Sequence, residues 1–397
     1  RSVSVGCPTV DASGSDIAIF LLVVGARFLV PLLIPRFPLP AILAALVIDA
    51  ADQTIFQQFT DLNLDGYQSY DKALDIYYLT IAYLSVYRNW TNGFAVDVAR
   101  FLWYYRLVGV VLFEITEQRW LLLVFPNTFE YYFIAYAFIR TMWDPRRLGH
   151  RAVVGMAAFI WIFIKLPQEW WIHIAQLDFT DFMKETVFGV DSADSWGDAF
   201  ANRPLVLVAI LAAIGGLIAL GAWVLRRMPP RDWSFGVDVD RPAPVDLWAP
   251  DDKRTDLDGL ASPYVSLRWP LFEKIALLTL VSSIFAMVLR VDARGIQIIG
   301  AITLVVLANA GISTLLERRG TDWSSIGVQF VALAAANTVL LIVYAFVIGD
   351  GRINLGNSLF FGLLLTVIIV LFDRFRAERA ERLAAEGMSD GREPVEQ

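Results

Sequence analysis

Cysteine and histidine are almost absent from this sequence of 397 residues, and their scarcity excludes several kinds of site. Cys7 is the only cysteine, so neither an intrachain disulfide nor a Cys-x-x-Cys redox pair can form. With only His150 and His173, a histidine-rich zinc or haem site is excluded as well. The sequence also lacks a Gly-x-x-x-x-Gly-Lys loop, which argues against a P-loop nucleotide site.

An excess of basic residues is also missing. The chain has 33 Lys and Arg against 40 Asp and Glu, a formal net charge of −7, and no basic stripe of the kind that nucleic acid requires. We therefore expect no nucleic-acid partner.

Apolar residues, in contrast, make up 57% of the chain, and its mean hydropathy is +0.54. The clearest apolar segment, residues 205–225, contains no charge and is followed at once by Arg226 and Arg227. A bilayer core of ~30 Å needs about 20 such residues in a helix, which satisfies its backbone hydrogen bonds internally. The sequence therefore predicts an all-α, polytopic membrane protein.

Ten further segments resemble this one, so we expect about 11 transmembrane helices. Basic residues flank alternate ends, which places the N-terminus outside and the C-terminus in the cytoplasm of a multi-pass protein of the plasma (inner) membrane. The expected spans are 15–34, 38–57, 73–89, 96–115, 119–141, 151–172, 205–225, 269–289, 296–316, 326–348 and 355–372.

The domain organisation follows from these spans. Residues 1–203 form a six-helix module with acidic, aromatic outer connections, and 204–225 are the seventh span. A cytoplasmic linker, 226–268, separates it from a four-helix segment, 269–373, and a charged cytoplasmic tail, 374–397. The buried charges and interrupted helices all fall in the first module, so we expect the functional site there. Prolines crowd its first connection, and Pro126-Asn127 breaks its fifth span.

Two Asp-x-x-Asp pairs, Asp49 with Asp52 and Asp178 with Asp181, lie near the outer ends of the second and sixth spans. Carboxylates three residues apart share one helix face, a geometry that can hold Mg²⁺ against a diphosphate. The pairs resemble the motifs of membrane prenyltransferases, although the flanking asparagine and third aspartate of that family are missing. The alternative is that these are solvated acids at helix ends, in outer connections that also carry Asp71.

A second candidate metal site, for Ca²⁺, is the sequence Asp61-Leu-Asn63-Leu-Asp65-Gly. It matches the first half of a calcium loop, in which alternate oxygens converge on one ion. The twelfth position, however, is Lys72 where glutamate is required, so a plain Asx/Gly turn is the alternative.

Buried charges are the remaining candidates for a substrate or ion pathway. Arg27 and Arg106 lie within spans, where a charge is costly unless it is paired or faces a cavity. We expect both to point into the protein, with Glu114 or Glu130, a carbonyl or a bound anion as the partner of Arg106.

Glu169 and His173 form the last candidate pair. They are four residues apart and can project from one helical face toward a metal or a proton path. A structural hydrogen bond at the aromatic interface is the alternative.

These observations leave three classes of function open. The first is a transporter or channel-like protein for a cation or an amphiphilic solute, working through the N-terminal module. The second is a Mg²⁺-dependent membrane enzyme acting on a lipid-linked phosphate at the outer face. The third is a scaffold or accessory subunit of a membrane complex. The partners expected are membrane lipids and either other membrane proteins or a second copy of the chain.

Overall fold

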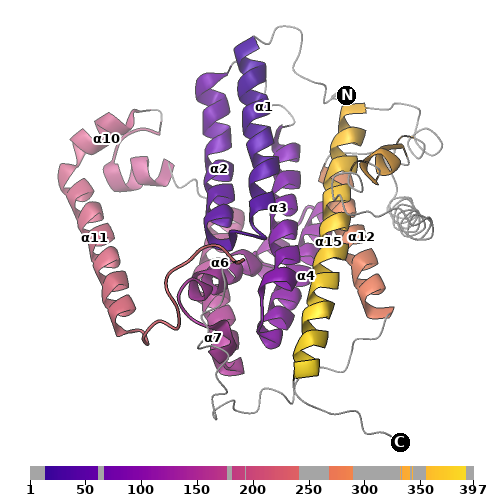
Figure 1. Cartoon of the computed structure of the whole chain (residues 1–397). Coiled ribbons are helices and arrows are strands. Elements are labelled where there is room, and N and C mark those ends of the chain that lie inside the picture. Colours follow the sequence, from indigo (N-terminus) through magenta and orange to yellow (C-terminus); the bar gives the residue numbers. More distant parts are fainter. Residues whose placement is uncertain are drawn as a thin grey trace, which may run out of the picture.

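The structure is a computed structural model that describes residues 14–60, 67–176, 181–192, 194–240, 268–288, 331, 333–339, 342 and 355–389. Every regular element in these ranges is a helix (Figure 1), so the described part of the chain is all-α, as its apolar segments predict. The number of spans stays a prediction, because 296–316 and most of 326–348 lie outside the described residues.

The first two predicted spans correspond to an antiparallel hairpin of α1 (Gly14–Leu29) and α2 (Pro38–Phe59) (Figure 1). Prolines shape the turn between them. Pro31 belongs to the short 3₁₀ helix η1 (Val30–Leu33), and Pro38 is the first residue of α2, where a missing N–H costs no hydrogen bond. This tight turn places the C-terminal half of α1 beside α2.

The third and fourth predicted spans correspond to α3 (Tyr67–Asn89) and α4 (Gly93–Thr116), which form the next hairpin. Asn92 caps α4 with its side-chain oxygen, and its amide donates to the carbonyls of Pro145 and Leu148 at 3.1 and 3.0 Å. One side chain thus ties this turn to the next connection, which holds the 3₁₀ helix η2 (Pro145–Arg147). Aromatic side chains of these helices fill the centre of the bundle. They are Tyr77, Tyr83, Tyr87 and Trp103.

The fifth span is broken, as predicted, into α5 (Trp120–Val124) and α6 (Thr128–Arg140). The sixth is continuous but irregular. It consists of α7 (His150–Phe159), the π-helix η3 (Ile160–Lys165), α8 (Leu166–Glu169) and the π-helix η4 (Trp170–Ile174). Pro167 has no N–H to complete the α-helical ladder, and the backbone bonds beside it widen to i→i+5 spacing.

The seventh span stands apart from the bundle. After the π-helix η5 (Phe182–Phe188) and α10 (Trp196–Asn202), α11 (Pro204–Arg227) runs down one side of the molecule, at the left of Figure 1. No residue of α11 is buried. A helix that is apolar all round and unburied is what a lipid-facing span requires.

Residues 228–240 of the predicted cytoplasmic linker, here called the strap, contact the bundle. The strap runs back across the end of the bundle. The side chain of Asp232 pairs with Arg147 at 2.8 Å, Arg36 pairs with Asp238 at 3.2 Å, and Trp233 Nε1 donates to the Arg140 carbonyl at 3.1 Å. The aspartates of the strap are therefore complementary to arginines at this end of the helices. Residues 241–267 lie outside the described residues.

The strap carries one perturbed acid and covers a small cavity. The backbone N–H of Asp240 donates to Asp238 and, together with Arg36, lowers the pKa of that carboxyl. A cavity of about 100 Å³ lies beneath the strap, lined by side chains that include Leu39, Ala137 and Trp233.

The C-terminal half contributes α12 (Arg268–Val288) and α15 (Leu355–Ser389), close to the predicted spans 269–289 and 355–372. The last helix continues well beyond its apolar part into the charged tail. Lys274 of α12 pairs with Asp373 of α15 at 2.7 Å, and both helices pack against α3.

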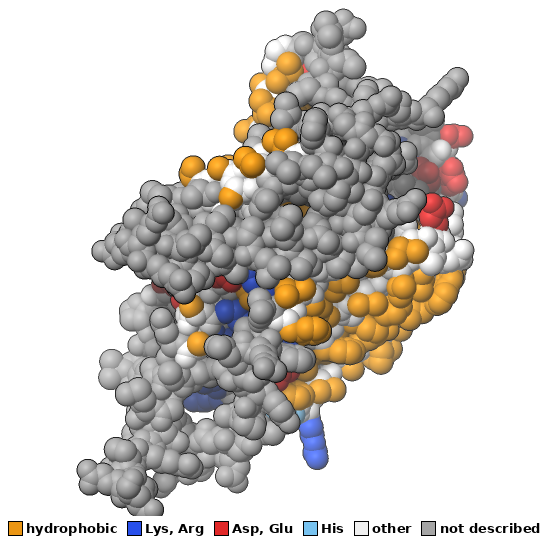
Figure 2. Space-filling view, turned by 90° about the vertical axis from the view of Figure 1, so that its right-hand side faces the viewer, with side chains coloured by type: hydrophobic (Ala, Val, Ile, Leu, Met, Phe, Trp, Pro, Cys, Tyr) orange, Lys and Arg blue, Asp and Glu red, His pale blue; other side chains and the backbone are white. Residues whose placement is uncertain are grey.

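Among the described residues, four helices are long and apolar enough to cross a membrane: Gly14–Leu33, Trp120–Arg140, His150–Ile174 and Pro204–Arg227. These helices indicate a membrane protein. The basic end of α11 and the end of α15 both point toward the lower end of Figure 1, and the strap rises from the end of α11 toward the lower ends of α1 and α2. Figure 2 shows hydrophobic side chains gathered over the described part of one face, with acidic side chains above them.

Candidate functional site

Four aspartates surround the guanidinium of Arg27. Its Nη1 contacts Asp52 and Asp71, and its Nη2 contacts Asp49 and lies 2.6 Å from Asp75. These five residues are called the Arg27 cluster. Arg27 thus points into the protein, as its position within a span predicts.

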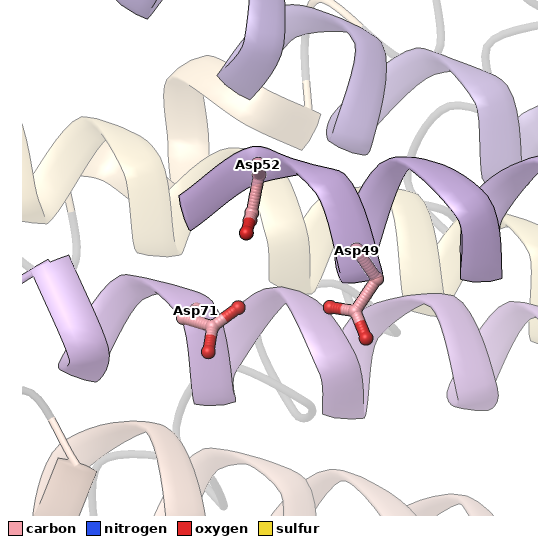
Figure 3. Close-up of side chains that lie close together, drawn as sticks. All are labelled: Asp49, Asp52 and Asp71. Carbon is pink, nitrogen blue, oxygen red and sulfur yellow. The ribbon is translucent and has the colours of Figure 1, made fainter. Parts of the chain in front are cut away.

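Helical spacing explains how the cluster forms. Asp49 and Asp52 are three residues apart on α2, and Asp71 and Asp75 are four apart on α3, so each pair lies on one helix face. Figure 3 shows the carboxylates of Asp49, Asp52 and Asp71 gathered in the space between α2 and α3. The α1–α2 turn then brings Arg27 to this space.

Asp71 lies on α3 and not in the predicted outer connection, because α3 begins at Tyr67, well before the predicted residue 73. The side chains of Arg27 and Asp52 are each 3% exposed, and those of Asp49, Asp71 and Asp75 are 27%, 37% and 39% exposed. One buried guanidinium therefore faces one fully buried and three partly buried carboxylates.

The cluster has oxygen atoms suited to a hard cation. Asp49, Asp52 and Asp71 each offer one carboxylate oxygen, and these three oxygens lie within 4.8 Å of one another. Mg²⁺ or Ca²⁺ would have to share them with Arg27, which contacts all three carboxylates. The guanidinium therefore stands where the metal hypothesis places an ion.

The other predicted metal ligands are the second Asp pair, Asp178 and Asp181, and the residues of the candidate calcium loop. Asp49 and Asp52 lie beside Asp71 of α3. Asp181 is exposed and immediately precedes η5 in the chain. Asp178 lies outside the described residues, so convergence of the two Asp pairs stays a prediction. The calcium-loop residues Asp61, Asn63 and Asp65 also lie outside them.

A second polar site surrounds the break between α5 and α6. Arg106 Nη1 donates to the Phe125 carbonyl at 3.0 Å, and the Asn127 backbone N–H donates to Glu169 Oε1 at 3.2 Å. A break in a membrane helix leaves such backbone groups without partners unless neighbouring protein supplies them. Of the partners predicted for Arg106, the carbonyl is correct. Glu114 pairs instead with Lys72 at 3.5 Å.

Beside this break lie Glu130, Lys165, Glu169 and His173, here called the Glu130 cluster. Glu130 accepts hydrogen bonds from Asn127 Nδ2 at 3.0 Å and Lys165 Nζ at 3.4 Å. His173 Nε2 lies 3.0 Å from Glu169 Oε2, as the four-residue spacing predicts. The side chains of Glu130, Lys165 and Glu169 are each less than 10% exposed.

Tyr78 joins the two clusters. Its hydroxyl donates to Glu130 Oε1, and on α3 it lies three residues, about one helical turn, after Asp75. The two clusters and Tyr78 are thus neighbouring polar groups, here called the network, that extend from α1, α2 and α3 to α6 and the sixth span.

Comparisons with known proteins add nothing to this geometry. No protein-family model, no curated protein and no solved structure matches the chain. The function of the site is therefore inferred from its own residues.

Sequence reasoning missed three members of the network. Lys165 is a charge inside the apolar run that precedes Pro167, a signal as clear as that of Arg106. Asp75 gives a similar signal, because it is a charge within the predicted span 73–89. Tyr78 gives no signal in the sequence, because α3 is rich in tyrosine and only the fold reveals which hydroxyl contacts Glu130.

Proposed function

We propose that this protein is an integral membrane transporter or channel-like protein that carries a cation through its N-terminal module. In this proposal about 11 helices cross the plasma membrane, with the N-terminus outside and the C-terminus in the cytoplasm. One observation carries the proposal. Four aspartates surround a single arginine inside a helical membrane protein.

The argument is electrostatic. If all four aspartates of the Arg27 cluster were ionised, Arg27 would balance only one of them, leaving an excess of three negative charges. Uncompensated charge in a low-dielectric interior is costly, so a carboxylate there takes up a proton or a cation. A scaffold needs only a balanced pair to lock its helices. The excess favours a site that takes up positive charge.

A proton is the cation that the geometry favours. Arg27 already contacts the carboxylates, and protonation neutralises one of them without displacing its guanidinium. Beyond the cluster, Tyr78, Glu130 and Lys165 offer successive groups that can donate or accept a proton. Glu169 and His173 continue the series.

The irregular helices support the same proposal. Transporters commonly build their sites from discontinuous helices, and π-helical stretches are frequent at functional sites. Here the Pro126 break and two π-helices adjoin the Glu130 cluster.

A second candidate rests on the three carboxylate oxygens of Asp49, Asp52 and Asp71. If Arg27 moved aside, they could hold Mg²⁺ for an enzyme acting on a lipid-linked phosphate. This candidate needs a rearrangement, whereas the proton pathway uses the cluster as it stands.

Proton flux in proteoliposomes tests the proposal. The purified full chain is reconstituted with a pH-sensitive dye inside the vesicles, and a potassium diffusion potential, negative inside, is imposed with valinomycin. We expect the lumen to acidify faster than in protein-free vesicles. Asp52→Asn and Glu130→Gln should remove most of that difference, whereas Glu117→Gln, a change at an exposed glutamate, should leave it intact.

Each other outcome argues against the proposal. Equal rates with and without protein would exclude proton conduction under these conditions. Equal rates in the wild type and in both network variants would place any flux outside the network. A Mg²⁺-dependent rise in thermal stability that Asp49→Asn abolishes, together with absent flux, would favour the enzyme.

A further inference from the structure

A separate group of charges lies at the other end of α3, where it meets α4, α12 and α15. Glu273 of α12 is buried at its centre. Its Oε1 accepts hydrogen bonds from the hydroxyls of Tyr83, at 2.6 Å, and Tyr87, while Arg376 contacts its other oxygen. The Arg27 and Glu130 clusters do not include these residues.

Four arginines gather around Tyr87: Arg100, Arg376, Arg379 and Arg382, here called the Tyr87 cluster. The Cζ atoms of Arg376 and Arg379 lie 4.6 and 5.9 Å from the centroid of the Tyr87 ring, and Arg382 Nη2 donates to the Tyr87 carbonyl at 2.7 Å. Arg100 Nε lies 3.5 Å from Glu273 Oε1. These residues come from α4 and α15, so the cluster exists only when the two helices meet at α3.

Positive charge is in excess in this cluster. Among the described residues, the carboxylates within salt-bridge distance of Arg100, Arg376 and Arg379 are the buried Glu273 and the 61% exposed Asp97. Arg379 donates to a backbone carbonyl, that of Trp90, at 3.4 Å. Burial and the neighbouring arginines both lower the pKa of the Arg379 guanidinium.

Several buried polar atoms of this region have no hydrogen-bond partner in the structure. Nε of Arg376 is one of them. The hydroxyl of Tyr136 is another, on a ring stacked against Trp90 with centroids 3.7 Å apart. A guanidinium has only donors, so whatever satisfies Arg376 Nε must be an acceptor. Buried donors are rarely left unpaired, because each costs free energy.

We propose that the Tyr87 cluster binds a phosphate group, from the headgroup of an anionic phospholipid or from free phosphate. Arginine and phosphate form charge-assisted, bidentate hydrogen bonds, which suits a cluster with surplus donors. The arginines of α15 follow within three turns of its predicted span, so they lie at headgroup depth. The side chains of Arg100 and Arg376, 28% and 20% exposed, remain accessible to such a group.

Lipid binding to the delipidated full chain in a non-ionic detergent tests this site. Phosphatidylglycerol, phosphatidylcholine and inorganic phosphate are titrated separately at constant ionic strength, and binding is followed by native mass spectrometry and by thermal stability. We expect phosphatidylglycerol to bind at least about tenfold more tightly than phosphatidylcholine, since it adds charge-assisted hydrogen bonds. Inorganic phosphate raising stability, with no preference between the lipids, would identify free phosphate as the source.

Matched arginine variants locate the site. Arg379→Gln should weaken binding of the preferred phosphate source about tenfold or more, and Arg379→Lys should weaken it less. Arg374→Gln, on the same helix but 47% exposed and paired with Glu378, should bind like the wild type. Equal binding by the wild type and both Arg379 variants would overturn the proposal, as would failure of both phosphatidylglycerol and phosphate to bind. If Arg379→Gln does not fold, the binding of Arg379→Lys is compared with that of the wild type, and equal binding overturns the proposal.

Discussion

Removal of Arg27 should be among the most damaging single substitutions in the N-terminal module. Arg27→Met keeps a flexible apolar side chain of similar reach but leaves four aspartates without their shared cation. Breaking a buried ion pair typically costs ~3–5 kcal/mol, whereas an exposed pair contributes about 0–1 kcal/mol. Asp52 is the only fully buried partner, so we expect most of the cost to come from that one carboxylate.

A double substitution separates this charge effect from lost packing. If ionised Asp52 is the source of the cost, Arg27→Met combined with Asp52→Asn should recover at least about half of the lost stability, because the remaining aspartates are partly exposed. Arg27→Lys should fall between the wild type and Arg27→Met, since one ammonium lacks the planar fork that reaches several carboxylates.

Unfolding by dodecyl sulfate in mixed micelles, followed by tryptophan fluorescence, measures these differences. Arg151→Met, at an exposed arginine, is the matched control and should change stability little. A loss below about 1 kcal/mol for Arg27→Met would refute the reasoning, because it would place Arg27 in the class of exposed pairs. Strictly additive effects of the two substitutions would show that Arg27 and Asp52 do not act as a pair.

Three further predictions concern other parts of the fold. Arg106→Ala should cost about 1–3 kcal/mol in the same unfolding assay, the range for one unsatisfied buried carbonyl, and a loss near 5 kcal/mol would instead indicate a buried carboxylate partner. Gly109→Ala should destabilise the protein, because a Cβ there would come within 2.1 Å of Phe125 Cβ, whereas Gly155→Ala meets open space and should be neutral. Asp232→Ala should release the strap and speed tryptic cleavage within it, and unchanged cleavage would show that the strap docks without this residue.

Local signals in the sequence predicted much of the architecture. The charge-free run of α11, the proline break before α6 and the four-residue spacing of Glu169 and His173 each depend on residues close in the chain. Such features follow from helix geometry and from the dimensions of the bilayer, so the sequence alone suffices for them.

Features that depend on packing between distant helices were not predictable. The Arg27 cluster joins three helices, and the assignment of Asp71 to a loop hid its approach to Arg27, 44 residues away. The sequence predicts a cytoplasmic linker that includes the strap, but it does not predict that the strap docks on the bundle. Its docking depends on arginines that the fold brings to the same end of the bundle. Opposite charges in a sequence do not specify which of them meet.

Infrared difference spectroscopy of the full chain in lipid tests the central claim most directly, namely that the Arg27 cluster holds exchangeable protons. Protonated carboxylic acids have a carbonyl-stretch band that ionised carboxylates lack, and it shifts when the protein is transferred to deuterated water. We predict such a band at neutral pH, reduced in Asp52→Asn or in Asp75→Asn and unchanged in Glu117→Gln. A wild-type spectrum without this band, or one that neither aspartate variant alters, would contradict the account.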